Sequence, residues 1–271
     1  MSSQISKLRV ADSFSKAANS YDGSAQLQRD VGHQLLDFGL PHAASIMQHE
    51  NVNMMDLGSG TGYFSQKLTE HYPQANLYCL DIAQGMLEHA RALRGSESIK
   101  WLCADAEALP LASQSIDFIF SSLAIQWCEN LNQLFSEIAR ALKPGGIALL
   151  STLGPGSLQE LRDSWAMVDG KVHVNQFEPL SDIMTRIDPR LSVELCEKKS
   201  HKLEYNKLQQ LTTDIKNIGA HNMNAGEAKG LTGRVKVKQF KQNYEVYRQE
   251  NGKLPASYEV YYLCLRKEKE G

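Results

Sequence analysis

Between residues 52 and 152, short apolar runs alternate regularly with amphipathic helical patterns, and this restricts the fold more than any other feature. In the helical stretches apolar residues recur every three to four positions, whereas the runs between them are too short to be buried helices. Parallel strands need crossover connections of this kind, with helices covering both faces of the sheet. The pattern predicts an α/β, doubly wound sheet whose first five strands lie at 52–57, 76–81, 99–105, 115–122 and 147–152.

The segments on either side of this core have a different rhythm. Residues 5–38 predict two helices, the first with an apolar face of Val10, Phe14, Ala18 and Tyr21. Beyond residue 152 we expect further helices and two more strands, which gives a seven-stranded, mostly parallel sheet. We expect one structural domain in three parts: an N-terminal helical lid (1–45), a ligand-binding core (46–152), and the remaining strands with helical cap insertions (153–271).

Composition and charge exclude several classes of partner. The net charge is −2, so no global basic field favours nucleic acid. The five cysteines form no C-x-x-C pair, which argues against a zinc knuckle or a redox dithiol. The chain shows neither a signal-peptide core nor a run of about 18 apolar residues. We expect a reduced, soluble, cytoplasmic protein without membrane contact.

A glycine-rich turn follows the first predicted strand in the stretch "MMDLGSGTGYF" (54–64). The phosphate loop G-x-x-x-x-G-K-[ST] is absent, and the dinucleotide fingerprint G-x-G-x-x-G fails because Tyr63 stands at its third glycine. What remains is Asp56 followed by Gly58, Gly60 and Gly62. Glycine has no Cβ, so such a loop lets a bulky ligand approach the backbone. A tight turn without a ligand is the alternative, but it needs only one or two such glycines.

Two further acids stand where neighbouring strands are expected to end. Asp81 follows Gly62 by 19 residues, close to the spacing of about 20 at which an acid meets ribose hydroxyls. Asp105 ends the third predicted strand. A single acid at a strand end is often a helix cap, but two beside this glycine loop favour a nucleoside site.

The motif D-x-G-x-G-x-G, with "SSLAIQW" and "LKPGG" further on, resembles the class I S-adenosylmethionine-dependent methyltransferases over residues 52–152. The resemblance implies a Rossmann-like fold, S-adenosyl-L-methionine as cofactor, S-adenosyl-L-homocysteine as product, and Asp105 on the adenine amine. The residues expected to bind the cofactor are Gln28, Asp56, Gly58, Ser59, Gly60, Gly62, Asp81, Ile82, Met86, Asp105, Ala106 and Ser122.

Segments outside the glycine loop narrow the resemblance. "SYDGSAQLQ", "AIQWCENL", "KNIGAHN" and "GLTGR" are similar to the malonyl-[acyl-carrier protein] O-methyltransferases of biotin synthesis, over nearly the whole chain. This resemblance implies methylation of the free malonyl carboxylate on carrier protein, or on coenzyme A. The methyl ester would mask the charge, so that fatty-acid synthesis enzymes extend the chain toward pimelate.

Tyr21, Gln126 and Trp127 are the candidate catalytic residues. We expect Tyr21 to border the transferred methyl group, although it also fits as a core residue, and cap packing is the alternative for Trp127. No His, Asp or Glu cluster has metal-ligand spacing, so no metal is expected. A carboxylate acceptor is already ionised at neutral pH and needs no base. His173 is either a base or, more often for a loop histidine, a bystander.

A basic stretch supplies a candidate docking face for an acidic carrier protein that carries malonyl-phosphopantetheine. Residues 229–248 hold six basic side chains and only Glu245 as an acid, and we assign partner binding to Arg234, Lys236, Lys238 and Lys241. A solvated helix face is the ordinary alternative. Two other functions stay open: methylation of a free small-molecule acid or quinone precursor, and a non-catalytic cofactor-binding scaffold.

Overall fold

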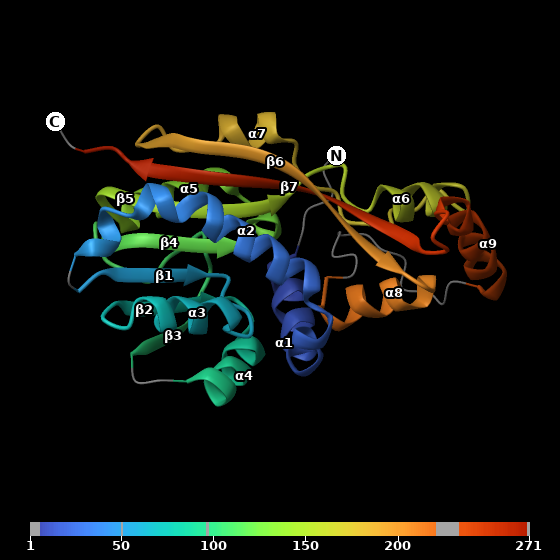
Figure 1. The fold of residues 1–271 in the computed structure, drawn as a ribbon, viewed down its shortest axis with the longest axis horizontal. Coiled ribbons are helices and arrows are strands. Elements are labelled where there is room, and N and C mark those ends of the chain that lie inside the picture. Colours follow the sequence, from blue (N-terminus) through green and yellow to red (C-terminus); the bar gives the residue numbers. More distant parts are fainter. Residues whose placement is uncertain (1–5, 50, 96–97, 221–232, 270–271) are drawn as a thin grey trace.

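A computed structural model describes residues 6–49, 51–95, 98–220 and 233–269. Its centre is one sheet in the order β3-β2-β1-β4-β5-β7-β6 (Figure 1). β1 to β5 pair in parallel, β7 runs antiparallel to β5, and β6 runs antiparallel to β7. The strands are β1 (Asn53–Leu57), β2 (Asn76–Asp81), β3 (Ile99–Cys103), β4 (Ile116–Ser122), β5 (Leu142–Leu153), β6 (Leu191–Tyr205) and β7 (Leu254–Lys267). The predicted doubly wound, seven-stranded sheet is confirmed.

Helices cover both faces of this sheet because its strands are apolar on both sides. In β4, Phe118 and Phe120 point into the core that α2 and α3 close, while Ile119 points into the core of α5 and α7. The helices are α1 (Lys7–Ser24), α2 (Gln26–Ala43), α3 (Tyr63–His71), α4 (Gln84–Arg94), α5 (Leu131–Ala141), α6 (Gln159–Ala166), α7 (Leu180–Thr185), α8 (Leu208–Asn217) and α9 (Arg234–Tyr244). Short 3₁₀ turns lie at Ile46–Gln48 (η1), Ile125–Trp127 (η2) and Glu245–Tyr247 (η3).

The cap is built on two strands that extend beyond the parallel core. β6 and β7 extend past the carboxyl ends of β1 and β4, and α6, α8 and α9 gather around that extension (Figure 1). α1 lies between the two regions, at the carboxyl ends of the parallel strands. Ligands bind at this edge of open α/β sheets. The fold therefore places α1 and the cap on either side of the site.

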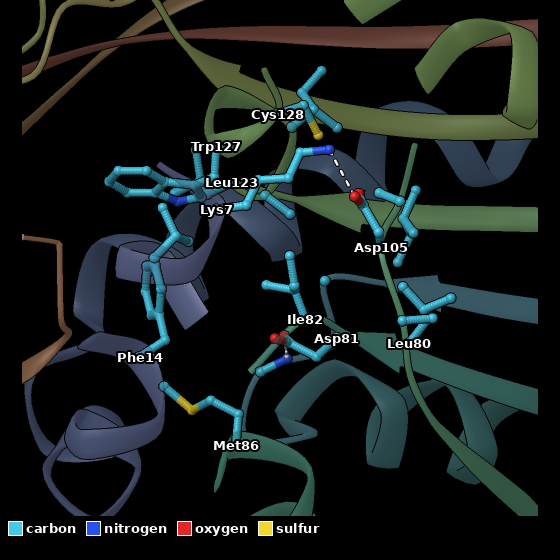
Figure 2. Close-up of a pocket in the computed structure, with 18 of the residues that line it drawn as sticks. Lys7, Phe14, Leu80, Asp81, Ile82, Met86, Asp105, Leu123, Trp127 and Cys128 are labelled. Carbon is cyan, nitrogen blue, oxygen red and sulfur yellow. Dashed lines mark hydrogen bonds and ion pairs between the residues drawn. The ribbon is translucent and has the colours of Figure 1, made fainter. Parts of the chain in front are cut away.

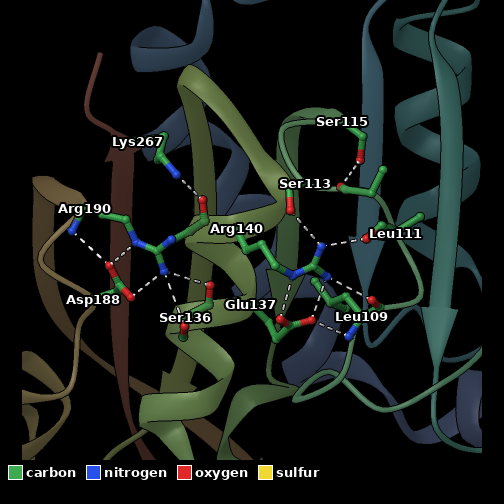
Figure 3. Close-up of polar contacts among 12 residues, drawn as sticks. Leu109, Leu111, Ser113, Ser115, Ser136, Glu137, Arg140, Asp188, Arg190 and Lys267 are labelled. Atoms are coloured by element: carbon green, nitrogen blue, oxygen red, sulfur yellow. Dashed lines mark hydrogen bonds and ion pairs between the residues drawn. The ribbon is translucent and has the colours of Figure 1, made fainter. Parts of the chain in front are cut away.

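The loop from β3 to β4 is fixed from behind by an ion pair on α5 (Figure 3). Arg140 donates to the carbonyl oxygens of Leu109 at 3.0 Å and Leu111 at 2.7 Å, and Glu137 accepts from the Leu109 amide at 2.7 Å. Hydrogen bonds from Arg140 hold the pKa of Glu137 below its usual range, so both groups stay charged. This anchoring matters for function because the same loop carries Asp105.

Among the first five strands, two boundaries differ from the sequence prediction by more than one residue. β3 ends at Cys103 rather than at residue 105, because the Asp105 carboxylate accepts the Glu107 amide at 2.9 Å and turns the chain. β5 begins at Leu142, before "KPGG", since that residue already pairs with Ile116 of β4. Lys229 and most of "GLTGR" lie outside the described residues, and the three-part division of the chain stays a prediction.

Candidate active site

The glycine loop after β1 has a backbone that side chains would obstruct. Gly58, Gly60 and Gly62 all have positive φ, at 77°, 52° and 79°. A Cβ on Gly58 would lie 2.3 Å from the Ala124 Cβ, whereas one on Gly60 would project into open space within the pocket. The three glycines thus serve two needs, left-handed backbone and room for a ligand.

Asp81 holds this loop from the end of β2. Its two carboxylate oxygens accept the amides of Gly60 and Ala83, each at 2.8 Å. Each oxygen keeps a further lone pair, so the carboxylate can also accept from paired hydroxyl groups. Asp105 lies one strand further out, and 35% of its side chain is exposed. The two acids line one pocket.

The pocket above the loop is a slot between apolar walls, with a volume of about 100 Å³ (Figure 2). Ile82, Met86 and Ala106 line it from the strand ends and α4, and Val10, Phe14 and Tyr21 line it from α1. Acids at one edge and apolar side chains across the slot suit a nucleoside, whose hydroxyls need acceptors and whose base needs an apolar cover.

Two buried side-chain atoms in a recess beside the loop have no hydrogen-bond partner among the described residues. They are the Ser59 hydroxyl oxygen and Gln28 Oε1. The recess is also lined by Asp56 and Ser122. Unpaired buried polar atoms are costly unless a ligand or an ordered water supplies the missing hydrogen bond. Together with the glycine cradle, they are compatible with a cofactor that has a polar, amino-acid-like end.

A second cavity of about 310 Å³ lies between the sheet and the cap. Its walls are largely apolar, with Leu153, Leu161 and Trp165 as examples. The described residues that line it include no lysine and no arginine. This cavity and the slot above the glycine loop share Phe14, Tyr21, Leu123 and Trp127.

Tyr21 stands where the slot, the recess and the cavity meet, since it lines all three. Burial raises the pKa of its hydroxyl, and the nearby Asp81 and Asp22 charges raise it further. The hydroxyl therefore stays protonated at neutral pH and is available as a donor rather than as a base.

The other two candidate catalytic residues differ in what they can offer. The Trp127 ring lies edge-on to Phe14, with ring centroids 5.4 Å apart, and faces both the slot and the cavity. Gln126 reaches only the cavity, and its amide nitrogen already donates to the Leu123 carbonyl at 2.7 Å. Its oxygen accepts from the Thr152 hydroxyl at 3.4 Å. Trp127 is therefore better placed at the junction than Gln126.

Comparison with known proteins identifies the family. Residues 55–150 match the family described as "Methyltransferase domain". A malonyl-[acyl-carrier protein] O-methyltransferase of Serratia marcescens is 38% identical over 264 residues, which is 97% of both chains. This chain belongs to the malonyl-[acyl-carrier protein] O-methyltransferase family.

A larger relative and a solved structure are also similar to this chain. The "Biotin biosynthesis bifunctional protein BioHC" of Cellvibrio japonicus is 47% identical over 268 residues, covering 98% of this chain and 51% of the relative. The chain thus spans about half the length of this bifunctional relative. The YcgJ protein of Bacillus subtilis shares the fold, with a TM-score of 0.59 at 19% identity over 88% of this chain and all of that one.

Several pocket residues of this malonyl-[acyl-carrier protein] O-methyltransferase family member were not predicted from the sequence. Lys7 and Cys128 line the slot, and Asn175 and Tyr258 line the cavity. Only Cys128 lies in a segment that carried the resemblance, "AIQWCENL", and the others come from the lid or the cap. The apolar spacing of α1 was the one available signal, because it predicted Phe14 on the same face as Tyr21.

His173 belongs to an aromatic stack at the cap end of the cavity. Trp165 lies between His173, 3.9 Å away by ring centroids, and Phe240, 4.2 Å away. Asp169 accepts from His173 at 2.8 Å and from Lys236 at 2.9 Å. These hydrogen bonds lower the pKa of Asp169. The loop histidine is therefore part of the cavity wall.

The basic helix α9 has two distinct sides. Phe240 and Tyr244 are buried, while Arg234, Lys236, Lys238 and Lys241 are exposed. The Lys236 charge is partly matched by Asp169. In the part of the chain that the structure describes, no three His, Cys, Asp or Glu side chains are grouped to hold a metal ion, and no helix is long and apolar enough to cross a membrane. A metal-free reaction stays a prediction.

Asp56 gives a testable pH dependence of stability. Burial raises the pKa of its carboxyl to about 7, although the Ser65 hydroxyl, 2.6 Å away, stabilises the anion. In the unfolded chain the pKa is about 4. The folded state thus binds more protons between these values, and stability falls as pH rises from about 4 to about 7. We expect Asp56→Asn to remove up to about 1.4 kcal/mol per pH unit of this slope.

Urea unfolding of the wild type and Asp56→Asn at several pH values measures the effect. The exposed Asp12→Asn serves as the control and should keep the wild-type slope. A difference in free energy of unfolding between wild type and Asp56→Asn that does not change with pH would contradict the assignment.

Proposed function

We propose that this chain is an S-adenosylmethionine-dependent O-methyltransferase that converts the free carboxylate of malonyl-acyl-carrier protein, or malonyl-coenzyme A, to its methyl ester. The observation that carries the proposal is the junction at Tyr21, where the slot opens beside an apolar cavity whose described lining residues include no lysine or arginine. Family membership supports the same substrate. We propose that the chain catalyses an early step of biotin synthesis.

The slot and the recess would hold the cofactor. S-adenosylmethionine supplies a methyl group on a positively charged sulfur. Asp81 would accept from the ribose hydroxyls and Asp105 from the adenine amine, while Ile82, Met86 and Ala106 cover the base. The unpaired oxygens of Gln28 and Ser59 would receive the amino-acid end, beside Asp56 and Ser122.

The cavity would desolvate the acceptor carboxylate without reducing the nucleophilicity of its oxygen. A carboxylate with a pKa near 4 is ionised at neutral pH, so transfer needs no base. A lysine or arginine clamp would hold the charge on oxygen and reduce its nucleophilicity. Neutral donors near the junction, the Tyr21 hydroxyl and the Trp127 indole, can orient the anion instead. His173 lies in the cap-side wall and is not required as a base.

The outer end of the cavity supports a carrier-linked substrate. Phe240 of α9 lines the cavity from inside, while the other side of the same helix presents Arg234, Lys238 and Lys241 to solvent. An acyl-phosphopantetheine arm would reach in past α9, and the acidic carrier would meet these charges. We also propose a cytoplasmic setting, which five free cysteines support.

A single transfer assay tests the proposal. Purified protein is incubated with methyl-labelled cofactor and malonyl-carrier protein, and we expect label on the malonyl group as a base-labile ester. Free malonate and quinone precursors serve as competing acceptors. Turnover of those free acceptors with none on the carrier would favour the alternative small-molecule methyltransferase. If calorimetry detects no cofactor binding, both methyltransferase functions are excluded. Cofactor binding without methyl transfer to any acceptor would favour a non-catalytic scaffold.

Charge reversal on α9 tests the docking face. We expect Arg234→Glu with Lys238→Glu to raise KM for malonyl-carrier protein by about 10-fold, since two interfacial charges are inverted. KM for malonyl-N-acetylcysteamine, a small thioester without the acidic carrier protein, should stay unchanged. Lys236 is left intact because it also pairs with Asp169.

The matched control reverses Arg91 and Lys100, two exposed cations on α4 and β3, away from α9 (Figure 1). It should leave both KM values near wild type. Equal increases for the carrier and the small thioester in the α9 variant would refute the docking assignment.

A further inference from the structure

α1 is tied at both ends to the edges of the slot that it covers. At its start, Lys7 Nζ lies 2.7 Å from Asp105 Oδ2 and 2.7 Å from Glu107 Oε2 (Figure 2 shows the link to Asp105). At its end, Asp22 accepts from Arg94 at 2.6 Å and from the Thr61 hydroxyl of the glycine loop at 2.6 Å. Between these ties, Val10, Phe14 and Tyr21 face the slot.

The tie at Lys7 is largely shielded from water. The side chains of Lys7 and Glu107 are 21% and 9% exposed. The other Glu107 oxygen accepts the amides of Glu129 at 2.7 Å and Asn130 at 3.1 Å. Glu107 is therefore a fixed anchor, from which Lys7 reaches to the more exposed Asp105. Charge-assisted hydrogen bonds with this little exposure are stronger than surface ion pairs.

One cation between two carboxylates leaves the group with a net negative charge. Asp105 Oδ1 accepts the Glu107 amide, and Oδ2 accepts from Lys7. A carboxylate has about four lone-pair sites, so Asp105 can take one more donor from the slot. Lys7 itself lines that slot. The lysine thus fixes the direction in which the remaining lone pairs of Asp105 point.

We propose that Lys7 is a positioning residue, which holds Asp105 toward the exocyclic amine of the cofactor's base and fastens α1 over the nucleoside. This rests on the proposed function, because it takes S-adenosylmethionine as the ligand of the slot. Lys7 sets the preference for an amino group at that position of the base. It also slows release of S-adenosylhomocysteine, since the product leaves only after the link from α1 to Asp105 opens.

The test is calorimetry with the full chain and two ligands, S-adenosylhomocysteine and S-inosylhomocysteine, which carries a carbonyl in place of the amine. For Lys7→Gln we expect Kd for S-adenosylhomocysteine to rise about 10-fold, as one charge-assisted contact is lost. The preference for the adenosyl over the inosyl ligand should fall with it, and stopped-flow displacement should show faster product release. Lys7→Arg should restore most of the affinity, because arginine can also bridge two carboxylates.

The matched control is Lys16→Gln on the same helix, where Lys16 pairs with Asp12 in solvent. It should bind both ligands as the wild type does. If Lys7→Gln is poorly folded by thermal melting, Glu107→Gln loosens Lys7 without touching Asp105 and should lower the base preference in the same way. Wild-type affinity and wild-type base preference in folded Lys7→Gln would overturn the inference. Failure of the wild type to bind S-adenosylhomocysteine would instead overturn the proposed function.

Discussion

Replacing Asp81 with asparagine is expected to weaken S-adenosylhomocysteine binding by at least about 100-fold. In the structure both carboxylate oxygens already accept backbone amides, from Gly60 and from Ala83. Asparagine offers one oxygen and one NH₂ group, so one of these amides would face a donor. The variant therefore loses the charge that we propose to bind the ribose hydroxyls, and we expect it also to displace the glycine loop.

The magnitude follows from two hydrogen bonds to a charged group, at about 1.5–3 kcal/mol each. Calorimetry measures it, and the exposed Asp37→Asn on α2 is the control that should bind as the wild type does. Thermal melting separates lost binding from lost folding. An affinity within about threefold of wild type, which is below the contribution of a single hydrogen bond, would remove Asp81 from the site.

The central sheet could be predicted because its strands are short, apolar and separated by amphipathic helices. β4 shows why, since it packs on cores at both faces and so cannot alternate with polar residues. The Asp81 position followed from the same pattern, because parallel strands end at one edge. Asp105 was expected on a strand and lies in a turn, since its side chain bonds to its own backbone neighbour.

The lid could be predicted only in part. The spacing of Val10, Phe14, Ala18 and Tyr21 correctly gave one apolar face on α1. Val10 and Ala18 are buried, but Phe14 and Tyr21 are half-buried and face the slot and the cavity. Helical periodicity shows which residues leave water and not what they meet, so the same stripe fits a core helix and a ligand-facing lid.

Contacts between segments far apart in the chain could not be predicted from the sequence. Lys7 and Asp105 are 98 residues apart, and neither is distinguished from other charged residues by its neighbours. The same holds for Lys236. In the sequence it is equivalent to Lys238 as part of a basic run, whereas in the structure it forms an ion pair with Asp169. A count of charges gives the net field of a segment, whereas the tertiary fold decides which charges are neutralised.

Gln28→Leu is the second change with a large expected effect. Gln28 lies on α2 and lines both the recess beside the glycine loop and the acceptor cavity. Its Oε1 is buried with no partner among the described residues, and an unpaired oxygen needs a donor. The ammonium group of the cofactor's methionine end is such a donor. We expect Kd for S-adenosylhomocysteine to rise about 10–100-fold, since a hydrogen bond to a charged group contributes about 1.5–3 kcal/mol.

Methylthioadenosine distinguishes this contact from general damage to the pocket, because it keeps the nucleoside and lacks the ammonium group. Its Kd should stay at the wild-type value in Gln28→Leu, while that of S-adenosylhomocysteine rises. Gln26→Leu, at the exposed start of the same helix, should change neither. Equal losses for both ligands would mean that Gln28 supports the fold of the pocket. Unchanged affinity for both, with a lower kcat, would move its contact from the cofactor to the acceptor carboxylate.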